Sequence, residues 1–209
     1  MTHFSLSVIE QKGVIDSLKR ALRTDKGIIC QLVYGKEEIT AAVQRLADAI
    51  SSDYAGQELL LVIVLKGAFF FAADLTRRLR LPIEIDFVKL ASYSGGETTG
   101  RVKITKDIEA VIAGRNVLVV EDIIDTGITL NFLLQHLAGR GPKSLKVCTL
   151  IDKRQRRRVD ITADYTGLFC NRGFLIGYGL DLDERYRALE AIYEVGNSPS
   201  CGGLNDNSM

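Results

Sequence analysis

The chain has 209 residues, 46% of them hydrophobic, and is therefore long enough to bury an ordinary core as one domain. Its 27 basic and 26 acidic side chains give a net charge of +1. The chain therefore lacks the large excess of positive charge that is typical of nucleic-acid-binding proteins. No apolar run reaches the roughly 20 residues that a membrane span requires, and the first ten residues lack the pattern of a signal peptide. We therefore expect a cytoplasmic protein with no nucleic-acid or membrane partner.

The spacing of apolar residues predicts alternating helices and strands. A helix with apolar residues on one face is predicted at 38–50, and a second at 69–80, which ends before Pro82. A third helix carries the leucines of 130–137. The predicted strands are 59–65, 83–90, 116–121, 145–151 and 173–178. This order implies an α/β sheet with right-handed crossovers between its strands.

Polar segments follow the first two predicted strands. Lys66 and Gly67 come directly after the first strand, where a solvated lysine is ordinary. Segment 91–101 contains three glycines with serine, threonine and a single tyrosine, a composition that favours a mobile segment over a packed one. On composition alone, this segment is a plain surface loop.

The most informative stretch is 116–130, NVLVVEDIIDTGITL. Its apolar strand ends in Glu121, Asp122 and Asp125, and the third predicted helix follows directly. At the carboxyl end of a parallel strand, a helix N-terminus offers free N–H groups and a positive dipole end to an anion such as phosphate. Two adjacent carboxylates would repel a phosphate unless they faced hydroxyl groups or a divalent cation. A sugar phosphate has hydroxyl groups that the carboxylates can face, and it can also bind a divalent cation. The alternative is that these acids are solvated loop residues, with Asp125 near the start of the helix.

Two later segments also place useful side chains at strand ends. The fourth predicted strand delivers Lys153, which begins a basic run of a kind that is more often solvated surface. Phe174 and Leu175 belong to the last predicted strand, where an aromatic ring can stack on a planar base and backbone groups can read its edge. Asp181 precedes Arg187 by six residues, which suits a metal ligand beside a diphosphate clamp. Taken alone, Phe174 would be a core residue and Arg187 a surface residue.

Cysteine and histidine offer little for catalysis or metal binding. The four cysteines show no metal-ligand spacing and, without a secretory signal, are expected to be free thiols. Of the two histidines, His3 lies near the start of the chain and His136 falls off the apolar face of its predicted helix. Base chemistry is therefore expected from a carboxylate.

The segment 117–129 resembles the phosphoribosyl-diphosphate-binding motif of type I phosphoribosyltransferases. In that motif, hydrophobic residues precede two acids, two further hydrophobic residues, Asp-Thr-Gly and a Thr, and the chain matches it nearly throughout. The other polar segments agree in order and spacing with the hypoxanthine-guanine phosphoribosyltransferases, over about 37–195. This resemblance implies an α/β type I phosphoribosyltransferase fold, in which helices flank a central, mostly parallel twisted sheet. A small hood would be built from the N-terminal region, about 1–36, and later segments; 1–195 would form the single domain and 196–209 a disordered tail.

The resemblance also assigns roles to individual residues. Those that would bind phosphoribosyl diphosphate are Lys66, Gly67, Glu121, Asp122, Asp125, Thr126, Gly127, Ile128, Thr129 and Arg187. Those that would bind the purine are Lys153, Phe174, Leu175 and Asp181. The lid loop over the reacting centre would carry Ser92 and Tyr93, and the ligands of Mg²⁺ would be Glu121, Asp122 and Asp181. In the family, the peptide before the lysine that corresponds to Lys66 is cis.

The implied reaction transfers a phosphoribosyl group from phosphoribosyl diphosphate to N9 of hypoxanthine or guanine, with help from Mg²⁺, and yields IMP or GMP and pyrophosphate. Asp125 is the expected catalytic residue, because it would accept the purine N7 proton and stabilise an oxocarbenium-like sugar. Both substrates are small molecules, and family members commonly form homodimers or homotetramers. Two alternatives stay open: a xanthine-preferring transferase and a non-catalytic sensor of phosphoribosyl diphosphate.

Two positions depart from the family pattern. The proline that often stands two to four residues before the stacking aromatic is missing, which leaves base preference open. Ile128 stands where some relatives have lysine. This loss is tolerable because backbone amides do most of the phosphate binding.

Overall fold

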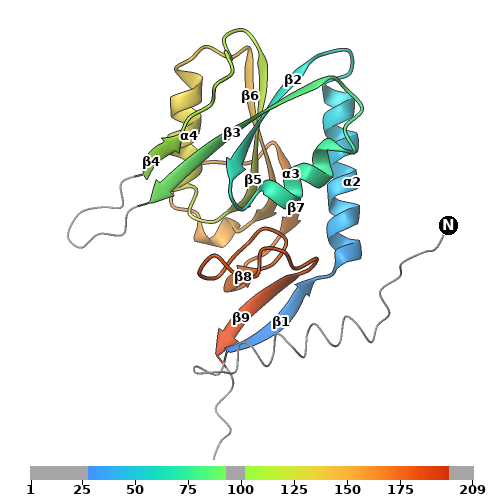
Figure 1. Cartoon of the computed structure of the whole chain (residues 1–209), viewed down its shortest axis with the longest axis vertical. Helices are drawn as coiled ribbons and strands as arrows, with labels where there is room; N and C mark the ends of the chain where they lie inside the picture. Colours follow the sequence, from blue (N-terminus) through green and yellow to red (C-terminus); the bar gives the residue numbers. More distant parts are fainter. Residues whose placement is uncertain (1–27, 93–101, 198–209) are drawn as a thin grey trace, which may run out of the picture.

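A six-stranded sheet forms the centre of the protein, whose computed structural model describes residues 28–92 and 102–197 (Figure 1). The strands are β2 (Leu59–Leu65), β3 (Ile83–Ser92), β4 (Val102–Lys106), β5 (Asn116–Ile124), β6 (Ser144–Asp152) and β7 (Tyr165–Phe169). Their order in the sheet is β4-β3-β2-β5-β6-β7. Neighbouring strands are parallel, except that β4 is antiparallel to β3 at one edge. The predicted α/β class and mostly parallel sheet are therefore confirmed.

Helices cover both faces of the sheet. They are α2 (Lys36–Asp53) and α3 (Phe69–Thr76) on one face and α4 (Ile128–Ala138) on the other. Within β2, Leu59 and Leu61 pack in the cluster that contains α2 and α3, whereas Leu60 and Val62 pack in the cluster that contains α4. A strand buried on both faces needs a continuous apolar run, which explains why β2 was recognisable from the sequence.

A second, smaller sheet forms the hood. It consists of β1 (Ile28–Tyr34), β8 (Phe174–Ile176) and β9 (Ile192–Asn197), in the order β1-β9-β8 with antiparallel pairing. In Figure 1 it lies below the main sheet, at the end where the cavity described below opens. The hood thus joins an early strand to two late ones, as expected. Residues 1–27 lie outside the described residues, and 196–197, the first two of the predicted tail, belong to β9.

The structure corrects two predicted elements. The strand expected at 173–178 does not join the main sheet but forms β8 of the hood, and β7 takes the edge position beside β6. The helix expected at 69–80 ends at Thr76. The chain then turns, because the N–H groups of Arg78 and Leu79 donate to the Leu75 carbonyl and that of Arg80 donates to Ser51 Oγ at 3.0 Å.

The sheet register brings the polar segments together. Ile63 of β2 pairs with Val120 of β5, so the residues that follow both strands lie at the same edge of the sheet. The carboxyl ends of parallel strands form the ligand crevice in folds of this type. None of the helices in the described ranges is long and apolar enough to cross a membrane.

Candidate active site

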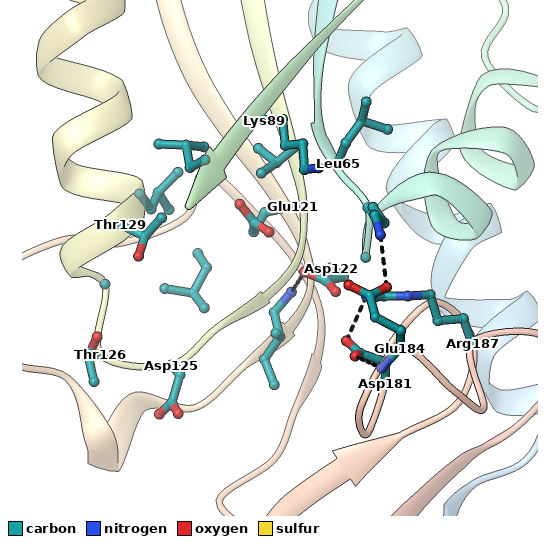
Figure 2. Close-up of a pocket in the computed structure, with 18 residues that line it drawn as sticks. Leu65, Lys89, Glu121, Asp122, Asp125, Thr126, Thr129, Asp181, Glu184 and Arg187 are labelled. Atoms are coloured by element: carbon teal, nitrogen blue, oxygen red, sulfur yellow. Dashed lines mark hydrogen bonds and ion pairs between the residues drawn. The ribbon is translucent and has the colours of Figure 1, made fainter. Parts of the chain in front are cut away.

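A cavity of about 530 Å³ opens at the carboxyl ends of β2 and β5. Figure 2 shows its residues, which come from the loop after β2, the end of β3, the segment that joins β5 to α4, and the turn near 181–187. The predicted site residues that line it are Lys66, Gly67, Glu121, Asp122, Asp125, Thr126, Gly127, Thr129, Asp181 and Arg187. Segments far apart in the sequence are thus brought to one place.

The loop 125–129 wraps the start of α4. Gly127 precedes the helix with φ of 80°, and a Cβ atom there would lie 2.7 Å from Ile161 Cγ2, so both backbone and space require glycine. The Thr126 carbonyl accepts a hydrogen bond from the Arg158 N–H at 3.0 Å, which ties this loop to the basic segment after β6. Ile128 is part of the loop but does not line the cavity with its side chain. The first N–H groups of α4 have no partner within the helix and suit an anion.

Glu121 and Asp122 place two carboxylates side by side at the end of β5. Burial, then the negative charge of Asp122, raises the pKa of Glu121 well above its ordinary value. Burial also raises the pKa of Asp122, whose carboxylate fills the space that a side chain on Gly67 would need. A Cβ atom on Gly67 would lie 1.7 Å from Asp122 Oδ2. Two crowded carboxylates with raised pKa values are an arrangement that a divalent cation would stabilise.

Asp181 belongs to a separate charged cluster on the opposite wall. Arg187 lies 2.9 Å from Asp181 and 3.0 Å from Glu184, and Lys66 lies 2.9 Å from Glu184 (Figure 2). The Leu65–Lys66 peptide is cis, as the resemblance implied. Within 28–92 and 102–197, no three acidic, histidine or cysteine side chains gather closely enough to hold a metal. The predicted Mg²⁺ ligands are therefore divided between the pair on β5 and Asp181.

A glycine allows the two walls to meet. Gly179 has φ of 102°, and a Cβ atom on it would lie 2.0 Å from the carbonyl oxygen of Gly67. The turn that carries Asp181 and Arg187 thus packs its backbone directly on the loop after β2. Any larger residue at Gly179 would separate the charged cluster from that loop.

Asp125 carries an incompletely satisfied carboxylate beside this cavity. Its Oδ1 atom is buried and has no hydrogen-bond partner among the described residues, although Arg156 Nε lies 3.3 Å away without hydrogen-bond alignment. Lys153 is buried nearby and donates through Nζ to the Gly173 carbonyl. Burial lowers the pKa of Lys153, and the negative charge of Asp125 opposes this effect. Both side chains therefore retain capacity for a ligand.

The predicted purine-binding residues lie in the hood, apart from Lys153 and Asp181. Phe174 begins β8 with 52% of its surface exposed, and Leu175 after it is buried. Neither lines the cavity, but Lys153 reaches the residue before Phe174 and so connects the hood to the ends of the main strands. Ser92 ends β3, and Tyr93 lies outside the described residues. The role of the lid thus stays a prediction.

The cavity also includes charged residues that the sequence did not single out. Lys89 of β3 pairs in register with Leu65, and its place near the end of a parallel strand was a usable signal. Glu184 lies in a tight turn, where the residues follow no periodic pattern. Its importance follows only from the two cations that it contacts.

Comparisons with known proteins identify the family. The family model of the phosphoribosyl transferase domain matches residues 33–183. A hypoxanthine-guanine phosphoribosyltransferase of Mycobacterium avium is 42% identical over 173 residues, which cover 79% of this chain and 85% of that protein. A hypoxanthine phosphoribosyltransferase of Salmonella typhimurium is 42% identical over 168 residues, which cover 79% and 94% of the two chains. A solved hypoxanthine-guanine phosphoribosyltransferase of Bacillus anthracis superposes with a TM-score of 0.76 at 47% identity, over 79% of this chain and 98% of that one. The chain therefore belongs to the phosphoribosyl transferase family, and its fold is that of the hypoxanthine-guanine branch.

Proposed function

We propose that this chain transfers a phosphoribosyl group from phosphoribosyl diphosphate to N9 of hypoxanthine or guanine, in line with the names of its relatives. The observation that carries the proposal is the cavity, where the loop 125–129, the carboxylates of Glu121 and Asp122, and the cations Lys66 and Arg187 converge. A sugar phosphate that bears a diphosphate leaving group needs each of these. The products are IMP or GMP and pyrophosphate.

The two ends of phosphoribosyl diphosphate would bind at opposite sides of the cavity. The first N–H groups of α4, with the hydroxyls of Thr126 and Thr129, would donate to the 5′-phosphate, and the helix dipole would add positive charge. Lys66 and Arg187 would donate to the diphosphate. Glu121 and Asp122 would face the ribose between them.

The same carboxylates fit Mg²⁺. Glu121 and Asp122 would supply two ligands from β5, and their raised pKa values support a site that a cation completes. Asp181 would have to approach them to become the third ligand, because the three do not gather closely enough among the described residues to hold a metal. When bound, Mg²⁺ neutralises charge on the departing diphosphate.

The purine would bind between Asp125 and the hood. Asp125, whose Oδ1 lacks a hydrogen-bond partner among the described residues, would accept or share the N7 proton as N9 attacks. Its negative charge would also stabilise the cationic sugar of the transition state. Lys153 Nζ would donate to the 6-oxo group, the ring of Phe174 would stack on the base, and the backbone of Leu175 would pair with the base edge.

The experiment that tests the proposal is a Mg²⁺-dependent assay of nucleotide formation from phosphoribosyl diphosphate. Hypoxanthine, guanine, xanthine and adenine are supplied separately. Turnover with hypoxanthine or guanine supports the proposal and ranks the bases. Turnover with xanthine alone moves the function to the xanthine-preferring transferase, and binding of phosphoribosyl diphosphate without product moves it to a sensor.

We also propose that the protein is a homo-oligomer. Phe69 and Phe70 at the start of α3 are both exposed, and their rings meet edge to face with centroids 5.4 Å apart. Neighbouring exposed aromatic residues are common at protein interfaces. A cytoplasmic location stays a prediction, which a fluorescent fusion would test.

A further inference from the structure

Glu184 occupies a position between two cations of the cavity. Its Oε2 atom accepts a hydrogen bond from Lys66 Nζ at 2.9 Å and from Arg187 at 3.0 Å. All three side chains line the cavity, and Figure 2 shows Glu184 and Arg187 next to Asp181. Lys66 and Arg187 are the cations that the proposed function assigns to the diphosphate. The Glu184 carboxylate therefore stands where an oxygen of the diphosphate would be.

The contact of Glu184 with Lys66 is too exposed to be needed for folding, and the contact with Arg187 joins Glu184 to a side chain that is 21% exposed. Its side chain is 64% exposed, and that of Lys66 is 50% exposed. Ion pairs with this exposure contribute little to stability, because water solvates both charges. A glutamate carboxylate is negatively charged at neutral pH. A group that stays charged but weakly held is free to leave when a stronger anion arrives.

The backbone directs Glu184 toward the cavity. Asp183 and Glu184 both have left-handed conformations, with φ of 52° and 63°, which L-residues rarely adopt. The turn is closed by hydrogen bonds between Leu182 and Arg185, and the Glu184 N–H donates to Asp181 Oδ2 at 2.9 Å. An ordinary surface glutamate would need no such turn. These features hold the carboxylate beside the two cations.

We propose that Glu184 is an internal competitor of the diphosphate. Its carboxylate neutralises Lys66 and Arg187 in the free protein, must move away when diphosphate binds, and then repels the bound anion from the edge of the site. The competition weakens the binding of pyrophosphate and of phosphoribosyl diphosphate, so that pyrophosphate leaves faster after transfer. This inference rests on the proposed function, because it takes diphosphate to be the ligand of these cations.

The variant Glu184→Gln removes the charge and keeps the size of the side chain. The full chain is titrated with pyrophosphate in the presence of Mg²⁺ by calorimetry. We expect pyrophosphate to bind about 5- to 10-fold more tightly to the variant, a range set by the loss of one exposed ion pair with Lys66 and one ion pair with the partly buried Arg187. In steady-state assays, the KM for phosphoribosyl diphosphate should fall and product inhibition by pyrophosphate should become stronger.

The matched control is Glu190→Gln. Glu190 forms a similarly exposed ion pair with Lys36 at 2.7 Å but does not line the cavity, so its loss should leave pyrophosphate affinity unchanged. Equal or weaker binding of pyrophosphate to Glu184→Gln, in a wild-type protein that turns over hypoxanthine or guanine, overturns this inference alone. A wild-type protein that neither turns over these bases nor binds pyrophosphate overturns the proposed function and this inference with it.

Discussion

Asp125 combines a buried acceptor atom with a position at the edge of the cavity. Arg156 Nε lies 3.3 Å from its Oδ1 atom, but no described residue donates an aligned hydrogen bond to it, and a buried polar atom without a hydrogen bond is uncommon in native proteins. The carboxylate also lies at the start of the loop that would bind the 5′-phosphate. These facts suit a group whose hydrogen-bond partner is the substrate.

The substitution Asp125→Asn tests this role. It keeps the shape of the side chain but removes its charge and its basicity, so kcat should fall by about 10²-fold or more. Binding of phosphoribosyl diphosphate, measured by calorimetry, should change little. The exposed Asp160 provides a control, because Asp160→Asn should leave both values as in the wild type. Unchanged turnover in Asp125→Asn would remove Asp125 from the mechanism.

Asp86 shows a structural use of a buried carboxylate. Its oxygens accept hydrogen bonds from the N–H groups of Glu109 and Ala110, at 2.6 and 2.8 Å, and of Phe87 at 2.6 Å. Burial by itself would raise the pKa of Asp86, but these N–H groups together hold it below its ordinary value of 3.8. The ionised form therefore fastens residues 109–110 to β3.

The stability contribution of Asp86 should depend on pH in a defined direction. Because its pKa is lower in the folded protein, the contribution is complete above the ordinary pKa of 3.8 and is lost as pH falls through the folded value. At pH 7, Asp86→Asn should lower the free energy of unfolding by about 2 kcal/mol. Urea unfolding at several pH values should show this difference shrinking below about pH 4. A difference that stays constant down to pH 3 would contradict the assignment.

At the level of elements, the join between β5 and α4 is a part of the site that packing constrains. Gly127 combines a positive φ with crowding by Ile161 and Val159. Gly114 also has a positive φ, of 72°, but a Cβ atom on it would have no neighbour within 4 Å. Comparing substitutions at these two glycines therefore separates the effect of backbone strain from the effect of crowding.

Alanine substitutions at these two glycines should differ in outcome. Gly114→Ala should lower the free energy of unfolding by roughly 1–2 kcal/mol, the strain of a left-handed L-residue, and leave activity unchanged. Gly127→Ala should cost more stability and should also raise the KM for phosphoribosyl diphosphate, because the loop 125–129, proposed to bind the 5′-phosphate, must move. Denaturant unfolding and steady-state kinetics measure both effects. Equal losses of stability in the two variants would show that the neighbours of Gly127 accommodate the methyl group without displacing the loop 125–129.

The elements that could be predicted from the sequence are those with a strong local signal. β2 and β5 have continuous apolar runs because both of their faces are buried, and α2 has a regular apolar face. β7 and β8 are only five and three residues long, which is too short for periodicity to decide which sheet they join. Their placement depends on pairing with strands distant in the sequence, and no local sequence pattern indicates which strand is the partner.

The site follows the same division. The acids and threonines of 121–129 are contiguous, so they could be assigned from one motif. Lys89 lies near the end of a predicted strand, which was a usable signal, but its place in the cavity depends on sheet register. Glu184 enters the cavity through turn geometry, which no local pattern encodes. The division of the acids between two walls likewise needed the fold. A contiguous motif thus predicts which groups the segment 121–129 offers to a ligand, whereas the residues that surround this segment are known only from the tertiary structure.

At the scale of the whole molecule, α3 presents an exposed aromatic pair, Phe69 and Phe70, that does not line the cavity. Phe69 is 52% exposed at the start of this helix, and Phe132 is 38% exposed on α4, which covers the opposite face of the sheet. If the α3 surface joins two copies of the chain, light scattering after size-exclusion chromatography should give at least twice the mass of one chain. Phe69→Ser should then shift the protein toward the monomer, and Phe132→Ser should not. A wild-type protein with the mass of one chain would exclude the homo-oligomer.

The pairing of β1 with β9 determines when the protein can complete its hood, the proposed base-binding region. Ile28 pairs with Asn197, so the first and last strands of the described chain are neighbours, and β8 is held in the hood through β9. Contacts between residues this far apart in the sequence close late in folding, because a long loop must be ordered first. On the ribosome, the main sheet can form as β2 to β7 emerge, but β9 comes last. A nascent chain should therefore acquire the loop 125–129 first and its hood, with Phe174, only after β9 has emerged.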